Sequence, residues 1–150
     1  MNTLSEITEF LAPRKLAIAG ASRNPKKFGG TVFAELRKRG FELYPVHPEA
    51  KELDGVPSYA SVKELPAGLD RLYIVTPKPE TEGVVRDAAT YGIKYLWIQQ
   101  MSDTPEALAV AREHGMSVIS GKCMMMFAGP VSGVHGFHRW MMKLFGKFPK

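Results

Sequence analysis

IAGASRNPKKFGG, residues 18–30, joins an apolar run to a segment with helical spacing. A turn of small residues between a strand and a helix exposes backbone N–H groups at the positive end of the helix, and this arrangement favours an anion. Lys26 and Lys27 add two positive charges to the same turn. The stretch therefore predicts a strand, a turn suited to phosphate groups and a helix. The structural alternative is a tight turn whose lysines are solvated.

The same alternation continues along the chain. Short apolar runs rich in Val, Ile and Tyr alternate with longer segments of helical spacing, which is the pattern of repeated strand–helix units. The runs predict strands at residues 15–19, 42–46, 71–75, 94–98 and 116–119. The helical signals cover residues 30–39, 79–91 and 104–114. Continuous apolar strands are typical of a parallel sheet that is covered on both faces.

Glycines mark the ends of these helices, because glycine adopts the left-handed conformation without a Cβ clash. Each predicted helix closes with one: Gly40, Gly92 and Gly115. Asp103 or Ser102 is expected to cap the third helix, with Pro105 in its first turn. The segment 61–66 has room for only a short helix or an irregular crossover.

Strand–helix–strand units with right-handed crossovers produce a doubly wound sheet. We therefore expect an α/β fold of the Rossmann-like class, with a mainly parallel five-stranded sheet and helices on both faces. Ligands of such sheets bind outside the carboxyl ends of the strands, where the strand order switches. The loops at residues 20–29, 76–79 and 99–102 are thus expected to form one site.

The chain has 150 residues, 45% of them hydrophobic, which suits a single domain over residues 1–150. No apolar run reaches the length of a membrane span, and the opening MNTLSEITEF carries carboxylates where a secretory signal has a basic flank. The single cysteine, Cys123, agrees with a reducing compartment. We expect a cytoplasmic protein without stable membrane insertion.

The formal net charge of +5 and the pI of about 9.4 favour ligands that carry phosphate. The basic residues are dispersed, apart from the pair at 26–27, the triplet at 37–39 and a group in the last dozen positions. No long basic block resembles a nucleic-acid arm. We therefore expect a small-molecule ligand and no nucleic acid.

Two common nucleotide motifs are missing. After Gly20 the next glycine is Gly29, and the tip of the second strand has no acidic residue, so the dinucleotide fingerprint G-x-G-x-x-G is absent. Glu49 lies close by, beyond a proline. No glycine directly precedes the lysines of the first loop, and no Ser or Thr follows them, so the P-loop pattern is absent as well. The loop offers Gly20, the Ser22 hydroxyl, the Asn24 amide and its lysines instead, which suit a diphosphate with a further phosphate nearby.

Several segments in the same order resemble the stand-alone CoA-binding domain family, which is similar to the amino-terminal domain of the succinyl-CoA synthetase α subunit. They are GASRNPKKFGG, YPVHPEAKELDGVPSYASVKEL, LYIVTPKPE and KYLWIQQ, and the resemblance covers roughly residues 13–123. It implies a Rossmann-like domain with CoA or an acyl-CoA as its ligand.

The resemblance also implies a set of binding residues. The family's first loop, which wraps the CoA diphosphate, matches Gly20, Ala21 and Ser22, and its far side matches Lys26, Phe28 and Gly29. The P-V-N-P segment at the adenosine end matches Val46, His47 and Pro48, with histidine in the place of asparagine. The loop near the adenine and pantetheine portions matches Thr76, Pro77, Lys78 and Pro79. In the family's W-L-Q-L-G segment, Gln99 matches the glutamine, whereas Gln100, Met101 and Ser102 replace its leucine and glycine.

The chemistry of CoA agrees with this assignment, because CoA has a diphosphate and a 3′-phosphate and NAD lacks the third phosphate. Lys26, Lys27 and Lys78 are expected to lie near one another in a doubly wound sheet. The structural alternative for Lys78 is a solvated loop residue.

No set of catalytic residues is evident. A synthetase-type ligase needs a phosphorylated histidine on a second domain and a nucleotide-grasp partner, for which the chain has no room. His114 is expected to contact the last carbonyls of its helix. His135 and His138 lack a third metal ligand, so no metal site is expected. Cys123 is expected to be a small buried residue, and a mixed disulfide with the CoA thiol is the alternative.

Residues 124–150 are expected to form a C-terminal helical extension that packs on its own sheet, with a homodimer contact through this helix and a basic membrane-surface helix as alternatives. Taken together, the sequence favours a non-catalytic or regulatory module that binds CoA or an acyl-CoA. The alternative is an enzyme, either an NAD(P)-linked oxidoreductase or a subunit of an acyl-CoA-processing complex.

Overall fold

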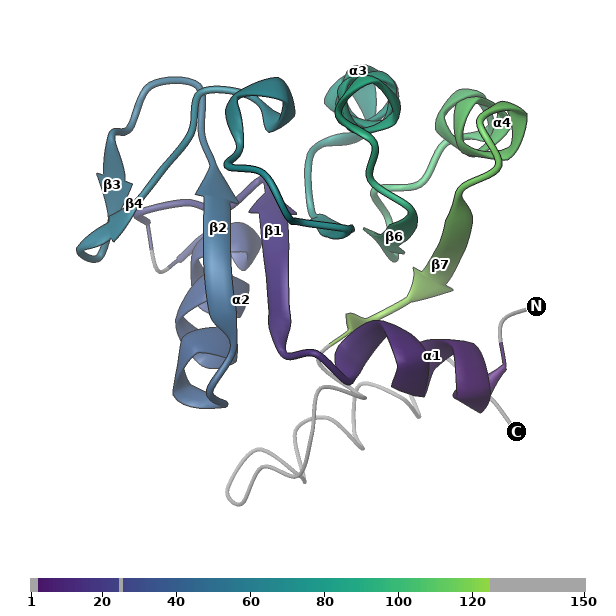
Figure 1. Cartoon of the computed structure of the whole chain (residues 1–150). Coiled ribbons are helices and arrows are strands. Elements are labelled where there is room, and N and C mark those ends of the chain that lie inside the picture. The colour runs from purple at the N-terminus through teal and green to yellow at the C-terminus, as the bar shows by residue number, and fades with distance from the viewer. Residues whose placement is uncertain (1–2, 25, 125–150) are drawn as a thin grey trace.

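The computed structural model describes residues 3–24 and 26–124. In these residues five parallel strands form one sheet in the order β2-β1-β5-β6-β7 (Figure 1). The predicted α/β class and parallel sheet are confirmed. The strands are β1 (Lys15–Ala19), β2 (Glu42–Val46), β5 (Arg71–Ile74), β6 (Tyr95–Gln99) and β7 (Ser117–Lys122).

Helices cover both faces of this sheet, as predicted (Figure 1). Alternate strand residues enter two hydrophobic clusters: Tyr73 and Trp97 pack with α1 and α2, whereas Leu72 and Leu96 pack with η1, α3 and α4. This alternation explains why the strands are apolar on both faces. The helices are α1 (Leu4–Leu11), α2 (Phe28–Lys38), the 3-10 helix η1 (Val62–Glu64), α3 (Lys78–Tyr91) and α4 (Pro105–Glu113).

The element ends differ from the predictions by a few residues. β1 and β2 have the predicted bounds, whereas β7 continues to Lys122 through a register shift opposite β6. The capping residue of α4 is Thr104, whose hydroxyl accepts the Ala107 N–H, so the prediction of Asp103 or Ser102 is wrong. His114 Nδ1 lies 3.0 Å from the Val110 carbonyl oxygen, which confirms the predicted contact with the end of that helix.

The predicted stop glycines all adopt positive φ, with values of 88°, 104° and 68° for Gly40, Gly92 and Gly115. The segment 61–66 contains the short helix η1 rather than an irregular crossover. Two elements were not predicted: α1 and an antiparallel pair formed by β3 (Glu52–Leu53) and β4 (Val56–Pro57).

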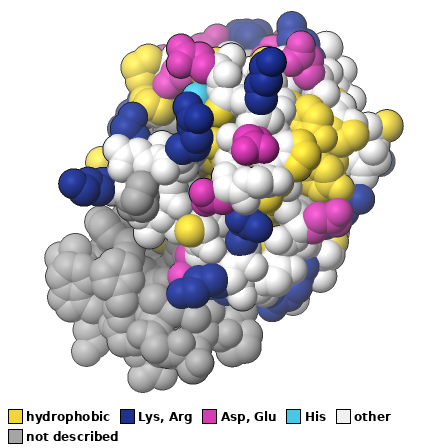
Figure 2. Space-filling model, turned by 90° about the vertical axis from the view of Figure 1, so that its left-hand side faces the viewer, with side chains coloured by type: hydrophobic (Ala, Val, Ile, Leu, Met, Phe, Trp, Pro, Cys, Tyr) yellow, Lys and Arg dark blue, Asp and Glu magenta, His cyan; other side chains and the backbone are white. Residues whose placement is uncertain are grey.

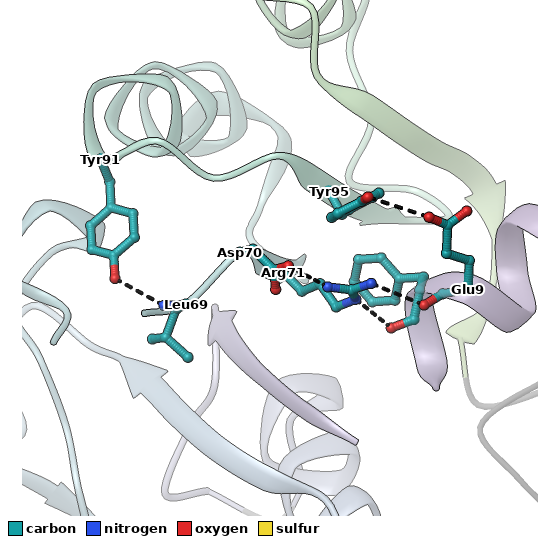
Figure 3. Close-up of polar contacts among 7 residues, drawn as sticks. Glu9, Leu69, Asp70, Arg71, Tyr91 and Tyr95 are labelled. Atoms are coloured by element: carbon teal, nitrogen blue, oxygen red, sulfur yellow. Dashed lines mark hydrogen bonds and ion pairs between the residues drawn. The ribbon is translucent and has the colours of Figure 1, made fainter. Parts of the chain in front are cut away.

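Arg71 attaches α1 to the sheet (Figure 3). Its guanidinium donates to the carbonyl oxygens of Glu9 and Phe10, both at 3.1 Å, and lies 2.6 Å from Asp70 Oδ2. A cation at the carboxyl end of a helix satisfies carbonyl groups that have no partner inside the helix. Phe10 also meets Trp97 edge to face, with 5.6 Å between ring centroids. These contacts hold the end of α1 at the first residue of β5.

The predicted extension from residue 125 onward, its possible dimer contact and the histidines at 135 and 138 lie outside the described residues. Within the described part of the chain, no helix is long and apolar enough to cross a membrane. On the face shown in Figure 2, Lys and Arg side chains are interspersed with Asp and Glu side chains.

Candidate functional site

A cleft of about 870 Å³ lies at the carboxyl edge of the sheet. It opens between the ends of β1 and β5. At this point the strand order switches, because β2 lies on one side of β1 and β5 on the other, and doubly wound folds bind ligands at such a switch. All three loops that were expected to form one site contribute to its lining, at residues 20–29, 76–79 and 99–102. The sequence therefore located the cleft correctly.

Glycines allow the backbone segments around the cleft to approach closely. A Cβ on Gly20 would lie 2.7 Å from the carbonyl carbon of Val75, and one on Gly29 would lie 2.0 Å from the Gly20 oxygen. A Cβ on Gly30 would lie 2.1 Å from the Asn24 oxygen. Real Cβ atoms do not approach backbone atoms this closely, so the first loop requires these glycines.

Side chains of the first loop hold the loop itself in shape. Ser22 Oγ accepts the Asn24 N–H at 3.0 Å, and Asn24 Oδ1 accepts the Lys26 N–H at 2.9 Å. Asn24 therefore braces the loop, and it lies outside the cleft lining. The Ser22 hydroxyl lines the cleft and keeps its own hydrogen for donation to a ligand.

The first turn of α2 faces the cleft without a capping group. Lys27 occupies the N-cap position and makes no side-chain capping bond, and the first turn contains no acidic residue. Lys27, Phe28 and Gly29 all line the cleft. The start of the helix, with the positive end of its dipole and the Lys27 ammonium, suits an anionic group.

The structure brings most of the predicted site residues together. The lining includes Gly20, Ala21, Ser22, Phe28, Gly29, Val46, His47, Pro48, Thr76, Pro77 and Gln99. Asn24, Lys26 and Lys78 are not part of it, and of the three lysines expected to lie together only Lys27 lines the cleft.

His47 takes the place that the asparagine of the P-V-N-P pattern occupies. Its Nδ1 accepts the backbone N–H groups of Glu49 and Ala50, at 3.1 and 3.0 Å. An asparagine side chain stabilises a turn by accepting an N–H two residues later in the same way. Because Nδ1 is the acceptor, the neutral ring carries its hydrogen on Nε2. The turn after β2 is thus kept although the residue type differs.

A buried hydroxyl joins two walls of the cleft. Thr81 Oγ1 donates to the Ser102 carbonyl oxygen at 2.7 Å and lies 2.9 Å from Thr76 Oγ1. Thr81 is fully buried and Thr76 is 6% exposed. The loop after β5 is therefore fastened to the loop after β6.

Gln99 is tied into the floor of the cleft. Its Oε1 accepts hydrogen bonds from the Tyr73 hydroxyl at 2.5 Å and from the Met124 N–H at 3.2 Å, so this oxygen has a structural role. Burial raises the pKa of Tyr73 well above its usual value, which keeps the phenol protonated as a donor to Gln99. Cys123 lies beside this network, 4% exposed and on the cleft lining. Its burial agrees with the expected structural role, and the mixed disulfide stays a prediction.

The wall of the cleft on the side of η1 and α3 was not predicted from the sequence. Among the described residues it contains Ser61, Val62, Glu80, Val84 and Asp87. Asp87 lies 3.9 Å from Lys63 Nζ, and both acidic lining residues belong to α3. Glu80, Val84 and Asp87 have i, i+4, i+7 spacing, which places them on one face of a helix and could have predicted this wall. Glu80 lies in the first turn of α3 and adds a negative charge to this wall, whereas the charge of Asp87 is offset by Lys63.

A parallel doubly wound sheet with an anion-suited helix start in its switch-point cleft defines a nucleotide-binding module of the Rossmann-like class. More specifically, the chain belongs to the CoA-binding domain family, because the family model described as "CoA binding domain" matches residues 14–128. This confirms the family that the sequence resembled.

Individual relatives agree with this membership. The chain is 32% identical to the acetate–CoA ligase (ADP-forming) II α subunit of Pyrococcus furiosus over 77% of its own length, but it spans only 28% of that subunit. It is 27% identical to the uncharacterised protein YneT of Bacillus subtilis, with 80% of this chain and 90% of that protein covered. A conserved hypothetical protein of Pyrococcus furiosus has a similar structure, with a TM-score of 0.72, 36% identity, and 75% and 97% of the two chains covered.

Proposed function

We propose that the chain binds CoA, free or acylated, in an extended pose across the carboxyl edge of the sheet and acts as a non-catalytic or regulatory module. The observation that carries the proposal is the start of α2, where Lys27 and an uncapped first turn line the cleft beside the Gly20 loop. A diphosphate is the part of CoA that such a site stabilises most.

The distribution of charge gives the pose its direction. The diphosphate lies against the α2 start, away from Glu80 and Asp87 on the opposite wall. The adenosine portion lies toward the turn at Val46, His47 and Pro48, and the pantetheine arm extends past Thr76 toward the loop after β6. The ligand thereby crosses the strand ends in the order of the sheet.

A binding role suits the polar groups of the cleft. Ser22 and Thr76 form hydrogen bonds that shape their loops, and the Tyr73 phenol is fully buried against Gln99. A nucleophile with an adjacent general base, as covalent catalysis requires, is not formed by the described lining residues. The ligase subunit of Pyrococcus furiosus is a much longer protein, of which this chain spans 28%, and the proposal includes no ligase activity.

Calorimetric titration with CoA, dephospho-CoA and NAD tests the proposal. We expect CoA to bind more tightly than dephospho-CoA, and NAD to bind weakly or not at all, because only CoA has the third phosphate. Binding of NAD without a response to CoA would favour the oxidoreductase alternative and overturn the proposal.

A charge reversal locates the phosphates. Lys27→Glu should lower the affinity for CoA by about tenfold to a hundredfold, since a hydrogen bond to a charged group contributes about 1.5–3 kcal/mol. Lys51→Glu changes the net charge equally at an exposed residue outside the cleft lining and serves as the control. Equal affinity of the two variants for CoA would remove the phosphate assignment.

A further inference from the structure

The loop after β6 contains a methionine in a backbone conformation that favours glycine. Gln99–Ser102 is a turn closed by the Ser102 N–H and the Gln99 carbonyl oxygen at 2.9 Å, and Met101, its third residue, has φ of 75°. Glycine is the usual residue where a turn needs positive φ at this position.

The strained turn is held in place from several directions. The Gln100 N–H donates to the Lys122 carbonyl oxygen at 3.2 Å, which attaches the turn to β7. Thr81 binds the Ser102 carbonyl oxygen, and Tyr73 binds the Gln99 side chain. A residue in an unfavourable conformation persists when its surroundings determine the backbone in this way, and such residues cluster at ligand sites. The backbone of Met101, from which its side chain extends, is therefore held at the cleft by the fold.

This side chain is the most exposed of the large hydrophobic side chains in the described part of the chain. Met101 is 70% exposed, compared with 45% for Phe28 and 43% for Leu4. Met101 and Phe28 both line the cleft. A single exposed apolar side chain is common on protein surfaces, but Met101 lines the cleft on a turn whose backbone is held in place, so its side chain is available to contact an apolar group of a ligand.

The location of Met101 identifies that group. β6 is separated from β1 by β5 alone, so the strand before Met101 lies about 10 Å from the strand before the phosphate-binding turn. A ligand whose diphosphate occupies the Gly20 turn reaches Met101 with the chain that extends from the diphosphate. In CoA this chain is the pantetheine arm, whose methyl and methylene groups suit the flexible thioether of methionine.

We propose that Met101 is a specificity residue that packs against the pantetheine arm and so selects CoA over nucleotides that lack the arm. This inference rests on the proposed function, and it assigns to the Met101 side chain a contact that a glycine at this position does not make.

Two ligands and two substitutions test the inference. The ligands are CoA and adenosine 3′-phosphate 5′-diphosphate, which has the same phosphates and no arm. Met101→Gly should weaken CoA by about fivefold, the loss expected for part of a methionine contact, and leave the affinity for the armless nucleotide unchanged. Met101→Leu keeps an apolar side chain and should stay within about twofold of the wild type for both ligands.

A stability measurement separates binding from folding. Glycine accepts the φ of 75° without strain, so Met101→Gly should keep or raise the melting temperature of the ligand-free protein while it weakens CoA. If Met101→Gly lowers the affinity for both ligands by the same factor, or leaves the preference for CoA unchanged, the role of Met101 is overturned. Failure of the wild type to bind either ligand would instead overturn the proposed function.

Discussion

Replacing Gly29 by alanine should separate the first loop from the start of α2. The new Cβ would lie 2.0 Å from the Gly20 oxygen and 3.1 Å from the Gly20 carbon. A relaxed carbon–oxygen contact is about 3.3 Å or longer, so the two backbone segments must move apart by about 1.3 Å. Overpacking of this kind costs about 1–3 kcal/mol, and the helical preference of alanine returns about 0.5–1 kcal/mol. Because the new Cβ meets backbone atoms, the cost lies at the upper end of that range, about 2–3 kcal/mol, and the net loss of stability is about 1–2.5 kcal/mol.

This displacement also changes the site, because the moved atoms belong to the turn that is proposed to hold the diphosphate. Gly29→Ala should therefore lower the melting temperature by about 2–10 °C and weaken the binding of CoA by about tenfold or more. Thermal unfolding and calorimetric titration of the same sample measure both quantities.

Gly83 provides the matched control. It lies in α3, it is exposed, and a Cβ there would meet no atom within 4 Å. Gly83→Ala should thus stabilise the protein by about 0.5–1 kcal/mol and leave CoA binding unchanged. The reasoning fails if Gly29→Ala matches Gly83→Ala in melting temperature and in affinity for CoA.

Three further changes probe the supports of the cleft. His47→Ala should weaken the binding of CoA several-fold, because the turn loses the acceptor for two N–H groups, whereas His47→Asn should retain the affinity. Equal affinities of the two variants for CoA in calorimetric titration would refute this role. Above a pH of about 10, Tyr73 loses its proton in the unfolded state and keeps it in the folded state, so the free energy of unfolding should fall as the pH rises. Urea unfolding at several pH values measures this fall, which should be smaller in Tyr73→Phe. Thr81→Val should cost about 1–3 kcal/mol by leaving the Ser102 carbonyl group without its donor; an unchanged unfolding midpoint would contradict this.

The fold was largely predictable because local and long-range signals agree. β1 and β2 are continuous apolar runs that begin with a charged residue, and both have the predicted bounds. The end of β7 was not predictable, because it depends on a register shift between Ile98 and Gln99. A shift of this kind is set by pairing with the neighbouring strand and leaves no local pattern.

The two missed elements had signals in the sequence. Thr3 and Glu6 form a reciprocal capping box at the start of α1, which is a recognised mark of a helix start. Asp54 and Gly55, both with positive φ, connect β3 to β4, and Asp-Gly is a strong hairpin signal. The length of strands β3 and β4, two residues each, leaves too little periodicity for detection by alternation.

The site was predictable as a set of loops but not as a set of contacts. The order of strands brings the loop residues to one edge, and that order follows from general rules of connection. Side-chain roles depend on distances that the sequence does not contain. Asn24 was expected to contact the ligand, and the structure shows that its Oδ1 accepts the Lys26 N–H, while the Gln99 Oε1 accepts the Tyr73 hydroxyl.

The hydrogen bonds of these loops have a consequence for binding. A side chain fixes the backbone at each wall: Ser22 in the loop after β1, His47 in the turn after β2, Thr81 between the loops after β5 and β6, and Gln99 at the cleft floor. A ligand that enters a preformed cleft orders few groups, so less of its interaction energy is lost to conformational entropy. The turn at Met101 is also preformed, because the free energy of folding offsets its backbone strain before any ligand binds. Small residues and buried hydroxyls are therefore expected to contribute to affinity without touching the ligand.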